Sequence, residues 1–262
     1  MNLKTLLVDE ERSVVSVTLN RPDVHNAFND ELIREASEVF LALEKRTDVR
    51  AVVLRGVGPN FCAGADLNWM SRMVSYSREA NVRDSSLLAK MFALIDDCPH
   101  PVVGRIQGAA IGGGVGLVSV CDVAIATTSS KFGLSEVKLG ILPAVISPYV
   151  ISKIGQSQAR ALFLTGERFD AARAQQIGLV HRVAESEEEL DRLTNDTVDQ
   201  LLSSGPEAVR ACKKLIRQVA ASERVDAIGF TIDAIAERRV SPEGQQGMSA
   251  FLKKERAPWI PS

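Results

Sequence analysis

The first half of the chain alternates short apolar runs with amphipathic stretches, a pattern that predicts strands separated by helices. Runs rich in β-branched residues predict strands at 14–19, 51–54, 101–103 and 122–126. Apolar residues that recur every three or four positions predict helices at 31–46 and 77–97. Asn29 or Asp30 can cap the first of these helices. Strands joined by helical crossovers favour the α/β class over an antiparallel sandwich.

The second half changes character, and from about residue 186 onward the pattern contains no strand signal. Helix-start signals are Asp170, the capping box of Ser186 with Glu189, Pro206, and Ser241 before Pro242. The helix after Asp170 is expected to end at Gly178, and the helix after Ser186 to end near residue 203, before Gly205. The last helix is expected to end near Lys254. We therefore expect a mixed core at residues 1–190 and a helical C-terminal region at 191–262.

Composition and charge narrow the class of protein. The chain has 262 residues, of which 45% are hydrophobic and 24% charged, as in ordinary globular proteins. A formal net charge of −2 gives no long-range attraction to nucleic acid or to an anionic membrane. The N-terminus lacks the apolar run of a signal peptide, and no window reaches the roughly 18 apolar residues of a membrane span. We therefore expect a cytoplasmic protein with no nucleic-acid or membrane partner.

The cysteines and histidines give no sign of a metal site or of disulfides. Four cysteines are scattered along the chain without a paired motif, so we expect buried free thiols in a reducing compartment. The three histidines have no metal-ligand spacing, so no bound metal is expected.

Two glycine-bearing segments are the first candidates for chemistry. Residues 60–67, Asn-Phe-Cys-Ala-Gly-Ala-Asp-Leu, follow a predicted buried strand and a Gly-Pro turn. Their small side chains would let a ligand approach the backbone closely. An ordinary strand-to-helix turn is the alternative interpretation.

The second segment, residues 108–117, contains three consecutive glycines after a predicted strand. Free N–H groups at a helix start would favour a developing negative charge there. A dinucleotide-binding loop is the competing interpretation, but the spacing G-x-G-x-x-G is not met. Counted from Gly112, Leu117 takes the place of the last glycine, and counted from Gly114, Ser119 does.

Together the two segments suggest that two backbone N–H groups converge on one oxygen. Such an oxyanion hole would stabilise a thioester carbonyl as it becomes an enolate. Proton transfer beside that carbonyl requires a nearby acid or base. Glu136, in the stretch Phe-Gly-Leu-Ser-Glu-Val, is the candidate, and an ordinary surface glutamate is the alternative.

These segments resemble the crotonase, or enoyl-CoA hydratase/isomerase, family. Five stretches match in order over nearly the whole chain: Arg21-Pro22 with Asn26-Ala27, 61–67, 108–122, 132–136 with Gly140 and Pro143, and 164–166 with Ala174 and 178–180. Segments 64–70, 134–149 and 239–247 are similar, more narrowly, to bacterial methylglutaconyl-CoA hydratases and their isohexenylglutaconyl-CoA relatives.

The resemblance implies a spiral of ββα units whose helical C-terminal part assembles trimers, often hexamers. It implies no metal or redox cofactor, since CoA is part of the substrate. It places the oxyanion-hole amides at Ala65 and Gly113. It also implies that Ala63, Ala65 and Leu67 lie along the adenine pocket of CoA. His25 and Ala27 would lie near the pantetheine or the phosphates.

One departure concerns the catalytic pair. Two-glutamate hydratases carry a first glutamate where this chain has Gly116, whereas the second is kept as Glu136. We interpret Gly116 as freeing space for a bulkier, branched or carboxylated acyl chain. Residues that could assist in place of the missing carboxylate are Asp66, Ser119 and Ser135.

The expected reaction is addition of water across the α,β double bond of an enoyl-CoA, with a branched or glutaconyl-type substrate such as 3-methylglutaconyl-CoA. Its second carboxylate would need a cation, for which Arg72 and Arg83 are candidates. Two alternatives stay open. One is a Δ3,Δ2-enoyl-CoA isomerase that uses the single glutamate, and the other is a non-catalytic CoA-binding or RNA-binding scaffold.

Overall fold

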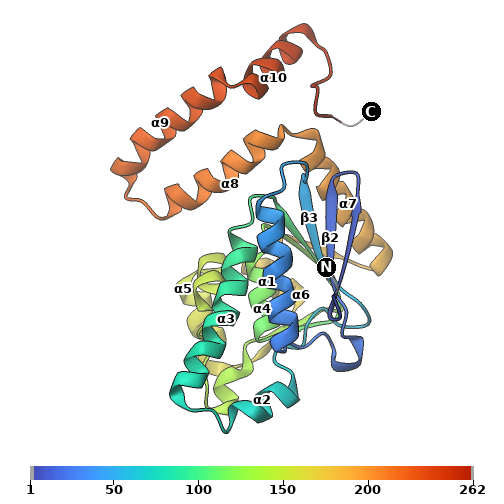
Figure 1. The fold of residues 1–262 in the computed structure, drawn as a ribbon, viewed down its shortest axis with the longest axis vertical. Coiled ribbons are helices and arrows are strands. Elements are labelled where there is room, and N and C mark those ends of the chain that lie inside the picture. The colour runs from blue at the N-terminus through green and yellow to red at the C-terminus, as the bar shows by residue number, and fades with distance from the viewer. Residues whose placement is uncertain (1–2, 261–262) are drawn as a thin grey trace.

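The computed structural model describes residues 3–260, in which two sheets are packed among helices and a helical layer extends from one end (Figure 1). The larger sheet has the order β1-β2-β3-β4-β6-β9. Its strands are β1 (Leu6–Glu11), β2 (Val14–Leu19), β3 (Ala51–Gly56), β4 (Val102–Ile106), β6 (Val123–Thr127) and β9 (Arg182–Ala184). Only β1 pairs antiparallel, and every residue of β4 is buried, as expected for a parallel strand covered on both faces.

A second, three-stranded sheet lies closer to the predicted site. It has the order β5-β7-β8, and its strands are β5 (Ala109–Ile111), β7 (Lys131–Gly133) and β8 (Arg168–Asp170). β5 and β7 run parallel, so the chain leaves both at the same edge of the sheet. Helix α4 (Gly113–Val120) follows β5, and the 3₁₀ helix η2 (Ser135–Leu139) follows β7. The second glycine segment and Glu136 are therefore neighbours in space.

The remaining helices of the core cover the sheets. They are α1 (Asp30–Glu44), α2 (Leu67–Met73), α3 (Arg78–Asp96), α5 (Ser147–Thr165), α6 (Ala171–Gln176) and α7 (Glu187–Ser203), with the 3₁₀ helix η1 (Pro22–Val24) before α1. The Asn29 side chain caps α1 by accepting a hydrogen bond from the Leu32 amide, which decides between the two predicted capping residues. The apolar face expected for this helix is buried.

The C-terminal layer consists of α8 (Pro206–Ala220), α9 (Arg224–Val240) and α10 (Pro242–Lys253), at the end of the molecule opposite α2 (Figure 1). Basic side chains of α8 attach it to the core. Lys213 Nζ lies 2.7 Å from Asp122 Oδ2, and Arg217 donates to the Asp96 carbonyl at 2.6 Å. The predicted boundary at residues 190 and 191 falls inside α7, whose buried Leu190 and Leu193 pack against the larger sheet.

The predicted helices correspond to α1, α3, α6, α7, α8 and α10 and the predicted strands to β2, β3, β4 and β6, and within the described residues no strand follows residue 186. The sequence interpretation did not find β1, β5, β7, β8, β9, α2, α5 or α9. The prediction of four buried thiols is wrong for Cys212, which is exposed on α8, while Cys62, Cys98 and Cys121 are buried and free. Among residues 3–260 no helix is long and apolar enough to span a bilayer, and no cluster of three or more His, Cys, Asp or Glu side chains could hold a metal.

Candidate active site

The two glycine segments lie side by side through backbone pairing. The Cys62 amide donates to the Ala109 carbonyl at 3.0 Å, and the Ile111 amide donates to the Cys62 carbonyl at 3.0 Å. This bridge extends the edge of β5 with the first segment. A side chain at Gly64 would have its Cβ 2.9 Å from the Ile111 oxygen. The close approach of the two segments therefore requires a glycine at position 64.

The backbone around Ala65 is fixed from both sides by Phe28. The Phe28 amide donates to the Gly64 carbonyl at 2.7 Å, and the Asp66 amide donates to the Phe28 carbonyl at 2.9 Å. Neither the Ala65 amide nor the Gly113 amide has an acceptor within residues 3–260. Helix α4 also lacks a side-chain N-cap, so its positive N-terminal end is available to an anion.

An ion pair supports the segment that carries Ala65. Arg21 Nη2 lies 2.8 Å from Asp66 Oδ2, and the two side chains are only 17% and 6% exposed. Arg21 also donates to the Ala27 carbonyl. The other oxygen of Asp66 accepts the Asn68 and Trp69 amides and caps α2. Because both of its oxygens are occupied, Asp66 holds the loop in place and is not available as a proton-transfer group.

Glu136 lies against the start of α4. Gly112 has φ 53°, a left-handed conformation that glycine adopts readily, and its amide donates to the Gly133 carbonyl at 2.8 Å. A Cβ at Gly112 would be 3.0 Å from Glu136 Oε1, so the missing side chain leaves room for the carboxylate. Glu136 Oε2 is buried and has no hydrogen-bond partner in the described chain. A buried acceptor without a partner is rare and indicates a functional group.

Burial raises the pKa of the Glu136 carboxyl above its ordinary value, with a smaller opposing contribution from its own backbone amide. No charged neighbour contributes to this shift. Glu136 is thus a lone carboxyl beside the free amide of Gly113. A raised pKa brings such a group closer to neutral pH, where it can both accept and deliver a proton.

The expectation of open space beside Gly116 is wrong. A Cβ at this position would come within 2.9 Å of Phe92 Cε1 and 3.0 Å of Ile146 Cβ. The space that a side chain would take is already filled by these two apolar residues, which are 0% and 3% exposed. The room that the missing carboxylate leaves is occupied by the protein itself.

We expect Gly116→Ala to destabilise the fold by about 1–3 kcal/mol, the usual scale of overpacking in a filled core. The measurement is denaturant unfolding of both proteins. Equal stability of Gly116→Ala and the original chain would contradict the packing described here.

The other predicted substrate contacts surround the same loops. The His25 carbonyl accepts the Ala63 amide at 3.0 Å, and the exposed His25 ring lies 3.0 Å from Asn60 Nδ2. Ala27 is buried beneath this turn, whereas Leu67 begins α2 with its side chain 81% exposed. The structure therefore places His25 against Ala63, and it places Ala27 and Leu67 next in sequence to Phe28 and Asp66, which flank Ala65. Their contact with CoA stays a prediction.

The suggested helpers are less suited to chemistry. Ser119 is buried and donates to the Val115 carbonyl at 2.8 Å, and Ser135 is half-buried at the start of η2. Arg72 is exposed and paired with Asp30, while Arg83 is exposed on α3. The residues that sequence reasoning missed are apolar or structural. Arg21 appeared only within a family motif, and nothing in the sequence connects Phe92 or Ile146 with Gly116.

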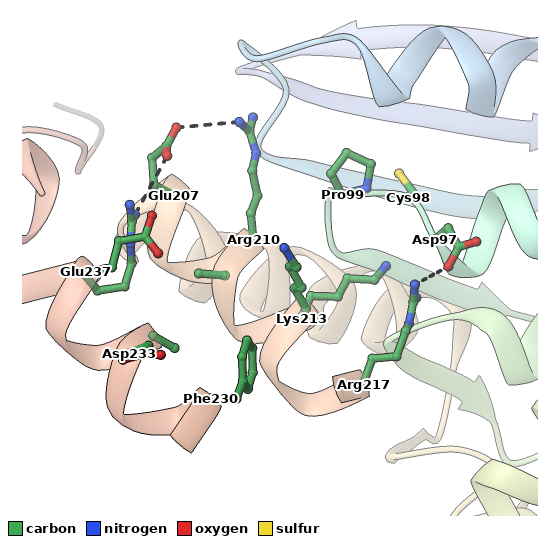
Figure 2. A pocket seen from close by; sticks show the side chains of 14 residues that line it. Asp97, Cys98, Pro99, Glu207, Arg210, Lys213, Arg217, Phe230, Asp233 and Glu237 are labelled. Atoms are coloured by element: carbon green, nitrogen blue, oxygen red, sulfur yellow. Dashed lines mark hydrogen bonds and ion pairs between the residues drawn. The ribbon is translucent and has the colours of Figure 1, made fainter. Parts of the chain in front are cut away.

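A cavity of about 520 Å³ lies away from this site, between α8, α9 and the turn at 97–99. Figure 2 shows its charged walls, with Arg210, Lys213 and Arg217 on one side and Asp233 and Glu237 on the other. None of the predicted site residues line it. Three of its basic side chains, Arg210, Lys213 and Arg217, attach α8 to the core, so we place the candidate chemistry at Glu136.

The chain has the crotonase fold, with two sheets of mostly parallel strands and a helical C-terminal part. Its glycine-rich helix start lies beside the buried carboxyl of Glu136. The family model for enoyl-CoA hydratase/isomerase matches residues 9–261, and the chain belongs to this family.

Individual relatives agree with this assignment. A short-chain-enoyl-CoA hydratase of Clostridium acetobutylicum is 31% identical over 259 residues, which cover 98% of this chain and 97% of the relative. The crystal structure of an enoyl-CoA hydratase from Shewanella pealeana superposes with a TM-score of 0.94 at 37% identity, covering 98% of this chain and 97% of the other. AtuE of Pseudomonas aeruginosa gives a TM-score of 0.95 at 36% identity over 98% of this chain and all of the other.

Proposed function

We propose that this protein is an enoyl-CoA hydratase that adds water across the α,β double bond of a branched or glutaconyl-type acyl-CoA, such as 3-methylglutaconyl-CoA. The observation that carries the proposal is the unpartnered Glu136 Oε2, buried beside a glycine-rich helix start whose Gly113 amide has no acceptor within residues 3–260. The similarity to proteins named as enoyl-CoA hydratases supports the reaction type.

In this mechanism the Ala65 and Gly113 amides donate to the thioester oxygen as negative charge accumulates on it. The Glu136 carboxylate accepts a proton from water while the water oxygen bonds to Cβ of the substrate. The same proton is then delivered to Cα, so hydroxide and proton add across the double bond and Glu136 returns to its starting form. One carboxyl suffices because it acts first as base and then as acid.

Close to Glu136, the described residues offer no evident cation for the distal carboxylate of a glutaconyl-type substrate. No cation contributes to the pKa of Glu136, and Arg72 is engaged by Asp30. Of the two predicted arginines, Arg83 is the one without a partner in the described residues. Arg83 stays a prediction from the sequence, because it is exposed on α3 and within residues 3–260 no contact joins it to the loops around Glu136.

A Δ3,Δ2-enoyl-CoA isomerase is the second candidate. The observation that favours it is the pair Phe92 and Ile146, which occupies the place of a second carboxylate and leaves Glu136 alone to move one proton between two carbons. Incubation with crotonyl-CoA, 3-methylglutaconyl-CoA and a 3-enoyl-CoA in heavy-oxygen water separates the reactions. Product containing solvent oxygen supports the hydratase, and isomer without it supports the isomerase. CoA-ester binding with no turnover of any substrate would favour a scaffold.

We further propose that the C-terminal layer joins copies of this chain into a trimer or a hexamer, acting in the cytoplasm. Helix α9 exposes Val225, Ile228, Ile232 and Ile235 to between 50% and 75%, and α10 exposes Phe251 and Leu252 to at least 80%. An apolar surface of this kind commonly marks an interface.

Light scattering after size exclusion should give three or six chains per particle. Ile232→Asp is expected to lower this number, because a charge on an apolar interface is left without a partner. Leu164→Asp, at a residue on α5 that is 73% exposed, serves as the control and should leave the number unchanged. A monomeric starting protein would exclude self-association.

A further inference from the structure

At three glycines, on α4 and just before it, the space that a Cβ would take is filled by a side chain from another part of the chain. Beside Gly112 it is Glu136, beside Gly113 it is Phe28, and beside Gly116 it is the pair Phe92 and Ile146. The Gly116 amide donates to the Gly112 carbonyl at 3.2 Å, so Gly116 lies one helical turn beyond Gly112 along α4. The two apolar side chains therefore lie one turn deeper along α4 than the carboxyl.

Phe92 and Ile146 are held firmly by their surroundings. The Phe92 ring meets the Phe28 ring edge-on, with centroids 6.0 Å apart and planes at 63°, and lies 6.1 Å from the Tyr149 ring. Ile146 precedes α5 and is buried against the same core. Together these two residues form a fixed apolar wall, which we call the Phe92–Ile146 wall.

A groove of about 420 Å³ lies on the surface of α3, lined by residues near Phe92 and Ile146 in the chain but not by these two residues themselves. Its α3 residues share one helix face, and Val145 closes the other side; the α3 residues are Arg78, Asn81, Val82, Ser85, Ser86 and Ala89. Ala89 lies about one turn before Phe92, and Val145 directly precedes Ile146. Since Phe92 and Ile146 face Gly116 while their chain neighbours Ala89 and Val145 line the groove, we infer that the wall lies between Gly116 and the groove.

We propose that Phe92 and Ile146 are specificity residues that close the inner end of the acyl site and limit the length of the acyl chain. This inference rests on the proposed function, because it assumes that the acyl group lies beside Glu136. A short acyl group ends at the wall. A chain of eight carbons would have to displace Ile146 before it could enter the groove, so short chains are favoured.

The test uses saturated acyl-CoA esters, which bind without reacting, so that binding is measured apart from turnover. Isothermal titration gives the dissociation constants of butyryl-CoA and octanoyl-CoA for the full chain, Ile146→Ala and Ile146→Val. The original chain should prefer butyryl-CoA. We expect Ile146→Ala to shift the ratio toward octanoyl-CoA by about 10-fold or more, and Ile146→Val by about 2-fold, as buried methylene groups gain apolar contact.

Two further variants isolate the wall from general loosening of the core. Met91→Ala truncates a fully buried neighbour of Phe92 on the same helix, and should leave the ratio unchanged. Adding Ser85→Trp to Ile146→Ala fills the groove and should reverse the gain for octanoyl-CoA.

The outcomes are distinct. An unchanged ratio in both Ile146 variants, or an original chain that already prefers octanoyl-CoA, overturns the inference. If Ile146→Ala does not fold, the ratio for Ile146→Val decides alone. Failure of the proposed function is seen separately, as an original chain that binds butyryl-CoA with the expected preference but neither hydrates nor isomerises any enoyl-CoA.

Discussion

Replacing Glu136 with glutamine should lower turnover by about 100-fold or more, the usual scale for loss of a general acid–base group. The amide keeps the shape of the side chain beside Gly112 but cannot transfer a proton. Steady-state kinetics with crotonyl-CoA measure the loss, and titration with butyryl-CoA should show that ester binding is largely kept. Near-normal turnover would remove Glu136 from the mechanism.

The same substitution is expected to change how stability depends on pH, because burial raises the pKa of Glu136 above its ordinary value. A raised carboxyl pKa contributes stability that is fully present below the unfolded-state pKa and is lost as pH rises through the folded-state value. Glutamine does not titrate. The melting temperature of the original chain, measured relative to that of Glu136→Gln, should therefore fall as the pH rises from acid to neutral. A constant difference across that range would mean that the carboxyl is not shielded from water.

Gly113→Pro is expected to reduce turnover by on the order of 100-fold more than Gly113→Ala does, the scale for removing one oxyanion donor. Both substitutions add a Cβ, which would stand 2.6 Å from Phe28 Cε2. Only proline removes the amide hydrogen. The fixed φ of proline suits this position, because Gly113 is the first residue of α4, and the clash of the Cβ with Phe28 is common to both variants.

Turnover of both Gly113 variants, with circular dichroism as the check on folding, makes the comparison. The alanine variant measures the effect of displacing Phe28, and the further loss in the proline variant measures the effect of the amide. Equal activities of two folded variants would show that the Gly113 N–H does not stabilise the transition state.

Some helices and strands could be predicted from the sequence and others could not, and the difference has physical reasons. Helix α1 could be predicted because its buried residues recur with helical spacing and Asn29 caps it. Strand β1 has a single buried residue, Leu6, so no alternating pattern identifies it. Strands β5, β7 and β8 have three residues each, too few for any period to appear. In α9 only Ala227 is buried, so its apolar residues do not indicate packing within this chain.

The site was predictable in its backbone elements but not in its packing. Consecutive glycines at 112–114 indicate free amides at a helix start, and the family motifs pointed to Glu136. Whether Glu136 is buried depends on how β7 and α4 meet, which no local pattern records. The space beside Gly116 was misjudged for the same reason, because Ile146 lies 30 residues away in sequence and reaches it only through the tertiary fold.

The contact between Gly116 and Ile146 also makes the evolutionary history of this site depend on the order of substitutions. A glutamate arising at position 116 in the present chain would collide with Ile146 and Phe92 before it could assist catalysis. The same glutamate fits only after residue 146 has become smaller and the Phe92 ring has also moved or been replaced. A lineage that holds Gly116 and Ile146 together is therefore kept from a two-carboxylate site by an epistatic barrier, even though each single change is chemically modest.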